Sequence, residues 1–199
     1  MDMPKIVDHK KQREKLAEAT WRVIRRDGLE RASVRNIAAE AGLSVGSMRH
    51  YFSTHSELLA FSMKLVSNKV NAQFQSFVST GNLQEDILQL LYELLPLDKE
   101  RSAEMEVWIA FTAKALVDPA LQSLSLQVSN EMRAGISWMI DSLIQYEPGC
   151  SHLDAKIETE RLLALIDGLA LHAIMQPDHV TPELIRSIVI HHLQSLLKH

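Results

Sequence analysis

The chain has 199 residues, of which 46% are hydrophobic and 23% charged, with 7 glycines, 6 prolines and one cysteine. A globular chain of this length buries a substantial core, as one long domain or two small ones. The sequence has no run of about 18 apolar residues, no secretory pattern at its start, and no second cysteine to form an internal disulfide with Cys150. These features exclude a transmembrane class, and we expect a cytoplasmic protein.

The net charge of −4 conceals two parts of opposite sign. Residues 1–55 hold 11 Lys and Arg against 7 Asp and Glu, a balance of +4, whereas residues 56–199 hold 10 against 18, a balance of −8. A basic segment joined to an acidic one is typical of a DNA-binding module attached to a regulatory module. We therefore predict two domains with these ranges, a DNA-binding domain and a regulatory and dimerisation domain.

The first predicted helix is capped by Asp8, runs to about Asp27 and ends at Gly28. Its apolar residues recur at helical spacing. The arm that precedes it, residues 1–7, has no clear pattern. Three lysines in the arm or early in the helix are candidates for contacts with a DNA backbone, with a solvated chain end as the alternative: Lys5, Lys10 and Lys11.

Two short helices joined by a tight turn are predicted next. Ser33 is typical of an N-cap and opens a helix that ends at about Glu40, and Gly42 supplies the left-handed residue that terminates it. Ser44 then caps a second helix over residues 45–51. Such a pair forms a helix-turn-helix, whose second helix fits the major groove of B-DNA. A capped helical hairpin in an ordinary bundle is the alternative.

A longer pattern runs through the same region. It comprises Arg13–Ala19, Gly28, Ser33–Ala41, Gly42-Leu43-Ser44, Gly46-Ser47, His50-Tyr51-Phe52 and Glu57-Leu58-Leu59. In order and spacing, this pattern resembles the N-terminal signature of the TetR family of bacterial repressors. The resemblance implies an all-α fold, in which a three-helix helix-turn-helix domain is followed by a larger helical bundle for ligand binding and dimerisation.

By matching position, the resemblance implies eight DNA-contacting residues: Arg35, Val45, Gly46, Ser47, Arg49, His50, Tyr51 and His55. We assign Arg49 to base reading, because Arg is the commonest partner of guanine O6 and N7. Ser47, His50 and Tyr51 are assigned mainly to phosphates, and Arg35 to either. Two positions depart from the family pattern. Arg49 stands where Tyr is common, which indicates a different operator, and His55 stands where a Lys usually holds a phosphate, which indicates a weaker or pH-sensitive contact.

The rest of the chain is predicted to be helical throughout, without a strand pattern or an internal repeat. A long helix over residues 55–79, capped by Ser53-Thr54, carries apolar residues on more than one side. We predict that this helix belongs to both domains and links them mechanically. The helices that follow are predicted over residues 83–95, 98–117, 120–146 and 154–175, with a last one capped by Thr181.

The last two helices carry apolar bands too broad for packing on one side. We expect them to pair with their copies across a twofold axis as a four-helix bundle, with core helices of a monomer as the alternative. A homodimer is also expected because one short DNA-binding domain cannot span a palindromic site. The residues predicted at the dimer interface are Leu162, Leu165, Gly168, Leu169, Ile185, Ile188, Val189, His192 and Leu196.

No motif of catalysis, phosphate binding or metal binding is present, so we expect no enzyme activity, no cofactor and no metal ion. The segment 103–111, followed by Ala115-Leu116 and Asp118-Pro119, resembles the body of the betaine-type regulators of the same family. Members of this family bind a small molecule between the body helices, and that binding releases DNA. The candidate pocket residues are Met105, Trp108, Phe111, Met132, Trp138 and His172.

The sequence therefore predicts a ligand-responsive, sequence-specific DNA-binding transcriptional regulator. In this interpretation a homodimeric repressor binds palindromic operator DNA, leaves it when a small-molecule effector binds, and has no membrane partner. One alternative is a helical small-molecule carrier or enzyme that binds no DNA. Another keeps DNA binding but makes the protein an activator or a nucleoid-associated factor.

Overall fold

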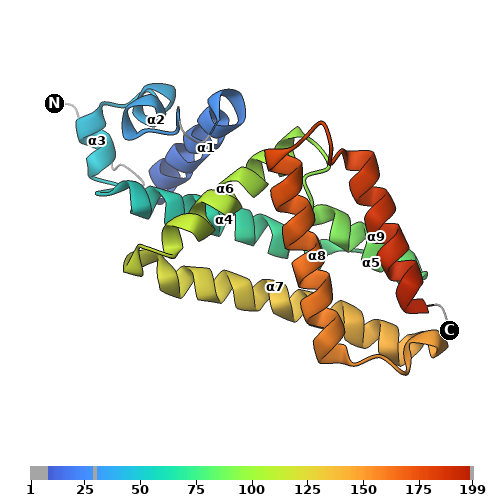
Figure 1. Cartoon of the computed structure of the whole chain (residues 1–199). Coiled ribbons are helices and arrows are strands. Elements are labelled where there is room, and N and C mark those ends of the chain that lie inside the picture. The colour runs from blue at the N-terminus through green and yellow to red at the C-terminus, as the bar shows by residue number, and fades with distance from the viewer. Residues whose placement is uncertain (1–8, 29–30, 198–199) are drawn as a thin grey trace. The chain divides into compact units, whose positions relative to one another are not determined.

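The computed structural model describes residues 9–28 and 31–197, with side chains from Lys11 on. Within these ranges the long elements are all α-helices (Figure 1), which confirms the all-α prediction. The helices are α1 His9–Asp27, α2 Val34–Glu40, α3 Val45–Arg49, α4 His55–Ser76, α5 Leu83–Glu93, α6 Lys99–Ala115, α7 Pro119–Tyr146, the 3-10 turn η2 Pro148–Cys150, α8 Ala155–Met175 and α9 Pro182–Leu197. The predicted arm over residues 1–7, with Lys5, and the predicted cap Asp8 lie outside the described residues, as does the side chain of Lys10.

The chain divides into two compact units, one up to Val66 and one from Ser67 on. The division falls inside α4, so this helix begins in the first unit and ends in the second. Leu58 and Leu59, near the start of α4, are buried in the first unit, which explains why the unit extends beyond the basic segment that the charge pattern marked. Each unit has a core of its own.

The first unit packs α1, α2, α3 and the first half of α4 around one apolar cluster. Its fully buried side chains include Leu16, Val23, Ile37, Met48 and Phe52. The predicted stop of α1 is observed, since Gly28 has a φ of 83° and its N–H donates to the Ile24 carbonyl at 2.9 Å. A residue with positive φ favours glycine because it lacks the Cβ that clashes in this conformation.

The second unit is a bundle of α5 to α9 together with the end of α4 (Figure 1). Its core combines residues from distant parts of the chain, among them Leu91 of α5, Met139 of α7, Leu162 of α8 and Ile185 of α9. Helix starts are set by polar caps, and three aspartates accept backbone N–H groups of the first turn: Asp98 for α6, Asp118 for α7 and Asp154 for α8.

Helices α3, α4, α5 and α6 each end two or three residues earlier than the sequence predicts. Helix α4 stops at Ser76 rather than near residue 79, because Ser79 and Thr80 donate their hydroxyls to the Asp86 carboxylate instead of continuing the helix. Helix α3 stops at Arg49 rather than Tyr51, because the next N–H groups turn back in tighter bonds, from Tyr51 to the Met48 carbonyl at 2.9 Å. In the described ranges, no helix combines the length and the apolar character needed to cross a bilayer.

Candidate nucleic-acid interface

The turn between α2 and α3 is fixed by a cap on each side. Ser33 accepts the N–H of Asn36 at 3.2 Å, as predicted, and starts α2. At the other end, Gly42 has a φ of 67°, and the N–H groups of Gly42 and Leu43 donate to the carbonyls of Ala39 and Ala38 at 3.1 and 2.8 Å. This pair of bonds is the Schellman arrangement, which satisfies the last carbonyls of a helix and reverses the chain. The turn of the predicted helix-turn-helix is therefore present.

Helix α3 is anchored on one side and free on the other. Ser44 caps it by accepting the Ser47 N–H at 3.0 Å. Met48 has no exposed surface, and burying such a side chain contributes roughly 1.5–3 kcal/mol. This anchor turns Val45, Gly46 and Arg49 outward, where all three are exposed. The rigid inner face and open outer face are what a helix needs to enter a groove.

The other predicted DNA-contacting residues differ in how free they are. Arg35 on α2 and His50 after α3 are exposed, whereas Ser47 and Tyr51 are half-buried. The Ser47 hydroxyl lies 2.9 Å from that of Ser44. His55 is exposed, but its Nε2 lies 3.2 Å from the Ala32 carbonyl oxygen. The His55 ring is therefore already engaged in a contact within its own chain.

Two braces hold the first unit together, and sequence reasoning missed both. Glu40 at the end of α2 accepts from Arg22 Nε at 2.9 Å and from Arg26 Nη1 at 2.8 Å, both on α1. The hydrogen bonds from Arg26 and then Arg22 lower the pKa of Glu40. The signal was available, since two arginines four residues apart share one face of a helix.

The second brace is a cation on aromatic rings. The guanidinium of Arg13 in α1 lies 5.2 Å from the ring centroid of Phe52 and 5.3 Å from that of Phe61 in α4. The two rings are themselves 5.4 Å apart. Arginine over an aromatic face is attracted by the ring quadrupole. Phe52, three residues after the end of α3, is thereby held in place.

The predicted effector residues do not share one environment. Phe111 is fully buried, and Met105, Trp108 and Met132 are half-buried within the second unit. Trp138 is 55% exposed and His172 is also at the surface of the chain. An exposed side chain does not line a pocket enclosed by one chain, so Trp138 and His172 are left out of the effector site proposed below.

The predicted dimer residues also separate into two groups. Leu162, Leu169, Ile185, Val189 and Leu196 lie in the chain's own core. These five side chains have almost no surface left to offer a partner, which corrects their assignment to an interface. Leu165, Gly168, Ile188 and His192 are half-buried. The same helices carry exposed apolar residues that the prediction did not include: Ile157, Leu171 and Met175 on α8, and Leu184 and Ile190 on α9.

A capped helix-turn-helix in a three-helix unit, followed by a separate and larger helical unit, defines a DNA-binding regulator of the one-component class. Comparison with known proteins agrees. Residues 16–60 match the model of the bacterial regulatory proteins of the tetR family, and residues 83–198 match the BetI-type transcriptional repressor C-terminal domain. The chain belongs to the TetR family and is a transcriptional regulator rather than an enzyme.

Individual relatives span nearly the whole chain. The HTH-type transcriptional regulator PksA of Bacillus subtilis (strain 168) is 45% identical over 196 residues, which cover 98% of this chain and 94% of PksA. The crystal structure of a transcriptional regulator from Rhodococcus sp. Rha1 has a TM-score of 0.79 and 33% identity, covering 93% of this chain and 95% of that one. A putative regulator from Saccharomonospora viridis, solved in complex with choline, has a TM-score of 0.78 and 22% identity, covering 96% and 97%.

Proposed function

We propose that the protein is a homodimeric repressor that places α3 of each chain in the major groove of a palindromic operator and leaves it when a small-molecule effector binds the second unit. The observation that carries this proposal is the outward face of α3, held by the buried Met48 and by the Ser44 cap. Family members of this kind bind operator DNA and typically act as dimers with effectors. Helix α4, which runs through both units, is the proposed transmitter.

Each predicted DNA-contacting residue receives a role according to its chemistry. Arg49 reads a base edge, because its guanidinium matches guanine O6 and N7. His50, Tyr51 and Ser47 contact phosphates, and Arg35 contacts a phosphate or a base. Val45 and Gly46 approach the groove walls at the helix start. The bond between His55 and Ala32 makes His55 a weaker phosphate ligand than a free lysine would be.

The dimer is proposed to form through the outer face of α8, together with α9. The residues of this α8 stripe are Ile157, Arg161, Ala164, Gly168, Leu171 and Met175. They recur at alternating spacings of four and three, the spacing at which helices pack side by side. Ile157 is 57% and Met175 66% exposed in the single chain. The apolar surface of Ile157, Leu171 and Met175 is covered when a second copy packs against it.

An organic cation is the proposed effector class. Glu106 on α6 is half-buried and has no hydrogen-bond or ion-pair partner among the described residues. Burial raises the pKa of Glu106, because no cation compensates for the lost hydration. The choline complex of the Saccharomonospora viridis regulator is consistent with this class.

The deciding experiment is a gel shift with DNA from the region upstream of the gene, run at two salt concentrations beside a scrambled duplex. We expect selective binding that weakens as salt rises, because phosphate contacts release counterions. Equal binding to both duplexes would contradict an operator-binding repressor. A map of bound sites relative to promoters separates a repressor from an activator or a nucleoid-associated factor.

The effector class is tested in the same assay with choline as the probe. Choline is expected to release the wild-type protein from its operator, and the Glu106→Gln variant is expected to bind the operator but to need more choline. An unchanged choline response in Glu106→Gln would remove Glu106 from the effector site. Release by neutral compounds but not by choline would overturn the cationic class.

A further inference from the structure

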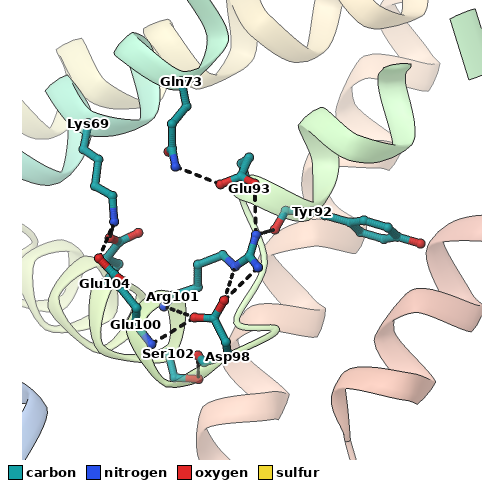
Figure 2. Close-up of polar contacts among 9 residues, drawn as sticks. All are labelled: Lys69, Gln73, Tyr92, Glu93, Asp98, Glu100, Arg101, Ser102 and Glu104. Atoms are coloured by element: carbon teal, nitrogen blue, oxygen red, sulfur yellow. Dashed lines mark hydrogen bonds and ion pairs between the residues drawn. The ribbon is translucent and has the colours of Figure 1, made fainter. Parts of the chain in front are cut away.

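The part of α4 that lies in the second unit is fastened by polar side chains. Lys69 Nζ lies 2.7 Å from Glu100 Oε1 and 2.6 Å from Glu104 Oε1, both on α6. One turn later, Gln73 Nε2 donates to Glu93 Oε2 of α5 at 2.9 Å. Figure 2 shows Lys69 and Gln73 extending from the same side of α4 toward these carboxylates. We call this set of bonds the lysine clamp.

Helices α5 and α6, which carry the carboxylates of the lysine clamp, are themselves held together by polar contacts. Arg101 donates from Nη1 to Glu93 Oε1 at 3.1 Å and to the Tyr92 carbonyl at 3.2 Å. It also donates from Nε to Asp98 Oδ2 at 2.9 Å, and Asp98 caps α6 (Figure 2). The junction between α5 and α6 is therefore held by one arginine. Because Arg101 ties α5 to α6, a shift of α6 moves the carboxylates that hold Lys69 and Gln73.

A second set of bonds holds another side of α4, and we call it the glutamate clamp. Glu131 on α7 accepts from Ser67 Oγ at 2.9 Å and from Asn71 Nδ2 at 3.3 Å. Gln127 of the same helix donates to Glu131 at 2.9 Å, and its hydrogen bond, with those of Ser67 and Asn71, lowers the pKa of Glu131. Residues 67 and 69 are two positions apart, about 200° around a helix, so the two clamps face different sides of α4.

We infer that the lysine clamp and the glutamate clamp are the device that holds α4 in its operator-binding orientation, and that Lys69, Gln73 and Glu131 are its positioning residues. The inference rests on the proposed function, in which α4 transmits effector binding to the DNA-binding unit. Beyond that function, the inference specifies the contacts that set the position of α4. None of these residues touches DNA or effector in the proposal.

The charges make the lysine clamp costly to break. The Glu104 side chain is only 9% exposed, so removing Lys69 leaves a buried carboxylate without its cation. Burial alone would lower the pKa of Lys69, but the hydrogen bonds to Glu100 and Glu104 raise it, so the ammonium stays charged at neutral pH. Glu106 of the proposed effector site lies on the same helix, two residues after Glu104. A movement of α6 on effector binding reaches Lys69 through one contact.

The test compares operator affinity with affinity for a scrambled duplex in full-length variants. We expect Lys69→Met to lose about 2- to 30-fold in operator affinity, the usual range for residues that modulate coupling, with unchanged affinity for scrambled DNA and unchanged dimerisation. Lys69→Arg is expected to restore operator affinity, because arginine also bridges two carboxylates. Lys99→Met is the matched control, since Lys99 is an exposed lysine of α6 outside both clamps.

A double-mutant cycle tests whether Lys69 acts through Glu104. The combination Lys69→Met with Glu104→Gln is expected to lose no more operator affinity than Lys69→Met alone, as residues in one contact are not additive. Gln73→Leu, a neutral change at a half-buried position, carries the same expectation if Lys69→Met fails to fold. Wild-type affinity in both Lys69→Met and Gln73→Leu would overturn the inference while leaving the repressor proposal intact. A wild-type protein that binds no operator would overturn both.

Discussion

The side-chain oxygen of Ser44 accepts the backbone N–H of Ser47 at 3.0 Å, and the two hydroxyls lie 2.9 Å apart. This single relationship starts the recognition helix and fixes the rotamer of a residue proposed to contact phosphate. Because α3 has only five residues, it depends on its cap more than a long helix would.

Replacing Ser44 by Ala is therefore expected to destabilise the first unit by about 0.5–2 kcal/mol and to weaken operator binding. Thermal unfolding followed by circular dichroism measures the first effect and a gel shift the second. Ser44→Asn serves as the control, because Asn caps helices as well as Ser does. Equal stability of Ser44→Ala and wild type would show that the cap is dispensable.

Arg49→Ala is expected to cost about 1–3 kcal/mol on the cognate operator and to relax base preference at one position. The physical reason is the loss of a bidentate contact with a base, while phosphate contacts remain. Binding to an operator library measures both effects, and Lys156→Ala, an exposed charge on α8, controls for net charge. An equal loss on random DNA would mean that Arg49 contacts a phosphate instead.

Leu171→Glu is expected to convert the proposed dimer into monomers, because it places a charge within the α8 stripe. Leu171 is 40% exposed in the single chain. Operator affinity is expected to fall as dimerisation is lost, because a palindromic site needs two DNA-binding domains. Analytical ultracentrifugation measures the oligomeric state. Leu126→Glu on α7 is the matched control, being a 64% exposed leucine outside the stripe; if both variants stay dimeric, the dimer forms elsewhere.

The brace on Glu40 predicts a pH dependence. Its pKa lies below the ordinary value of 4.5 because Arg26 and Arg22 stabilise the carboxylate. A lowered folded-state pKa gives stability that is present above the unfolded value and is lost as pH falls through the folded value. We therefore expect Glu40→Gln to unfold at a lower temperature than wild type at pH 7, and the difference to shrink below about pH 4.5. A difference that stays constant from pH 7 to 3 would exclude the ionised brace as its cause.

Local features were predictable because they depend on neighbours in sequence. The caps Ser33 and Ser44 were assigned correctly, since a side chain that caps a helix bonds to an N–H two or three residues away. The turn at Gly42 followed from the same kind of rule. The family resemblance, carried by these positions, is confirmed.

The sequence by itself thus determined the helices, the helix-turn-helix and the class of regulator, because those depend on short-range bonds and on residue spacing. Some helices carry apolar residues on all sides, and only the tertiary structure decided which face of such a helix packs against the rest of its own chain. Leu162 and Ile185 are core residues whereas Leu171 and Met175 are exposed, although all four have the same apolar chemistry. It also decided that Lys69 meets Glu104 and that Arg26 meets Glu40. Such pairs join residues far apart in the chain, and only folding brings them within hydrogen-bond distance.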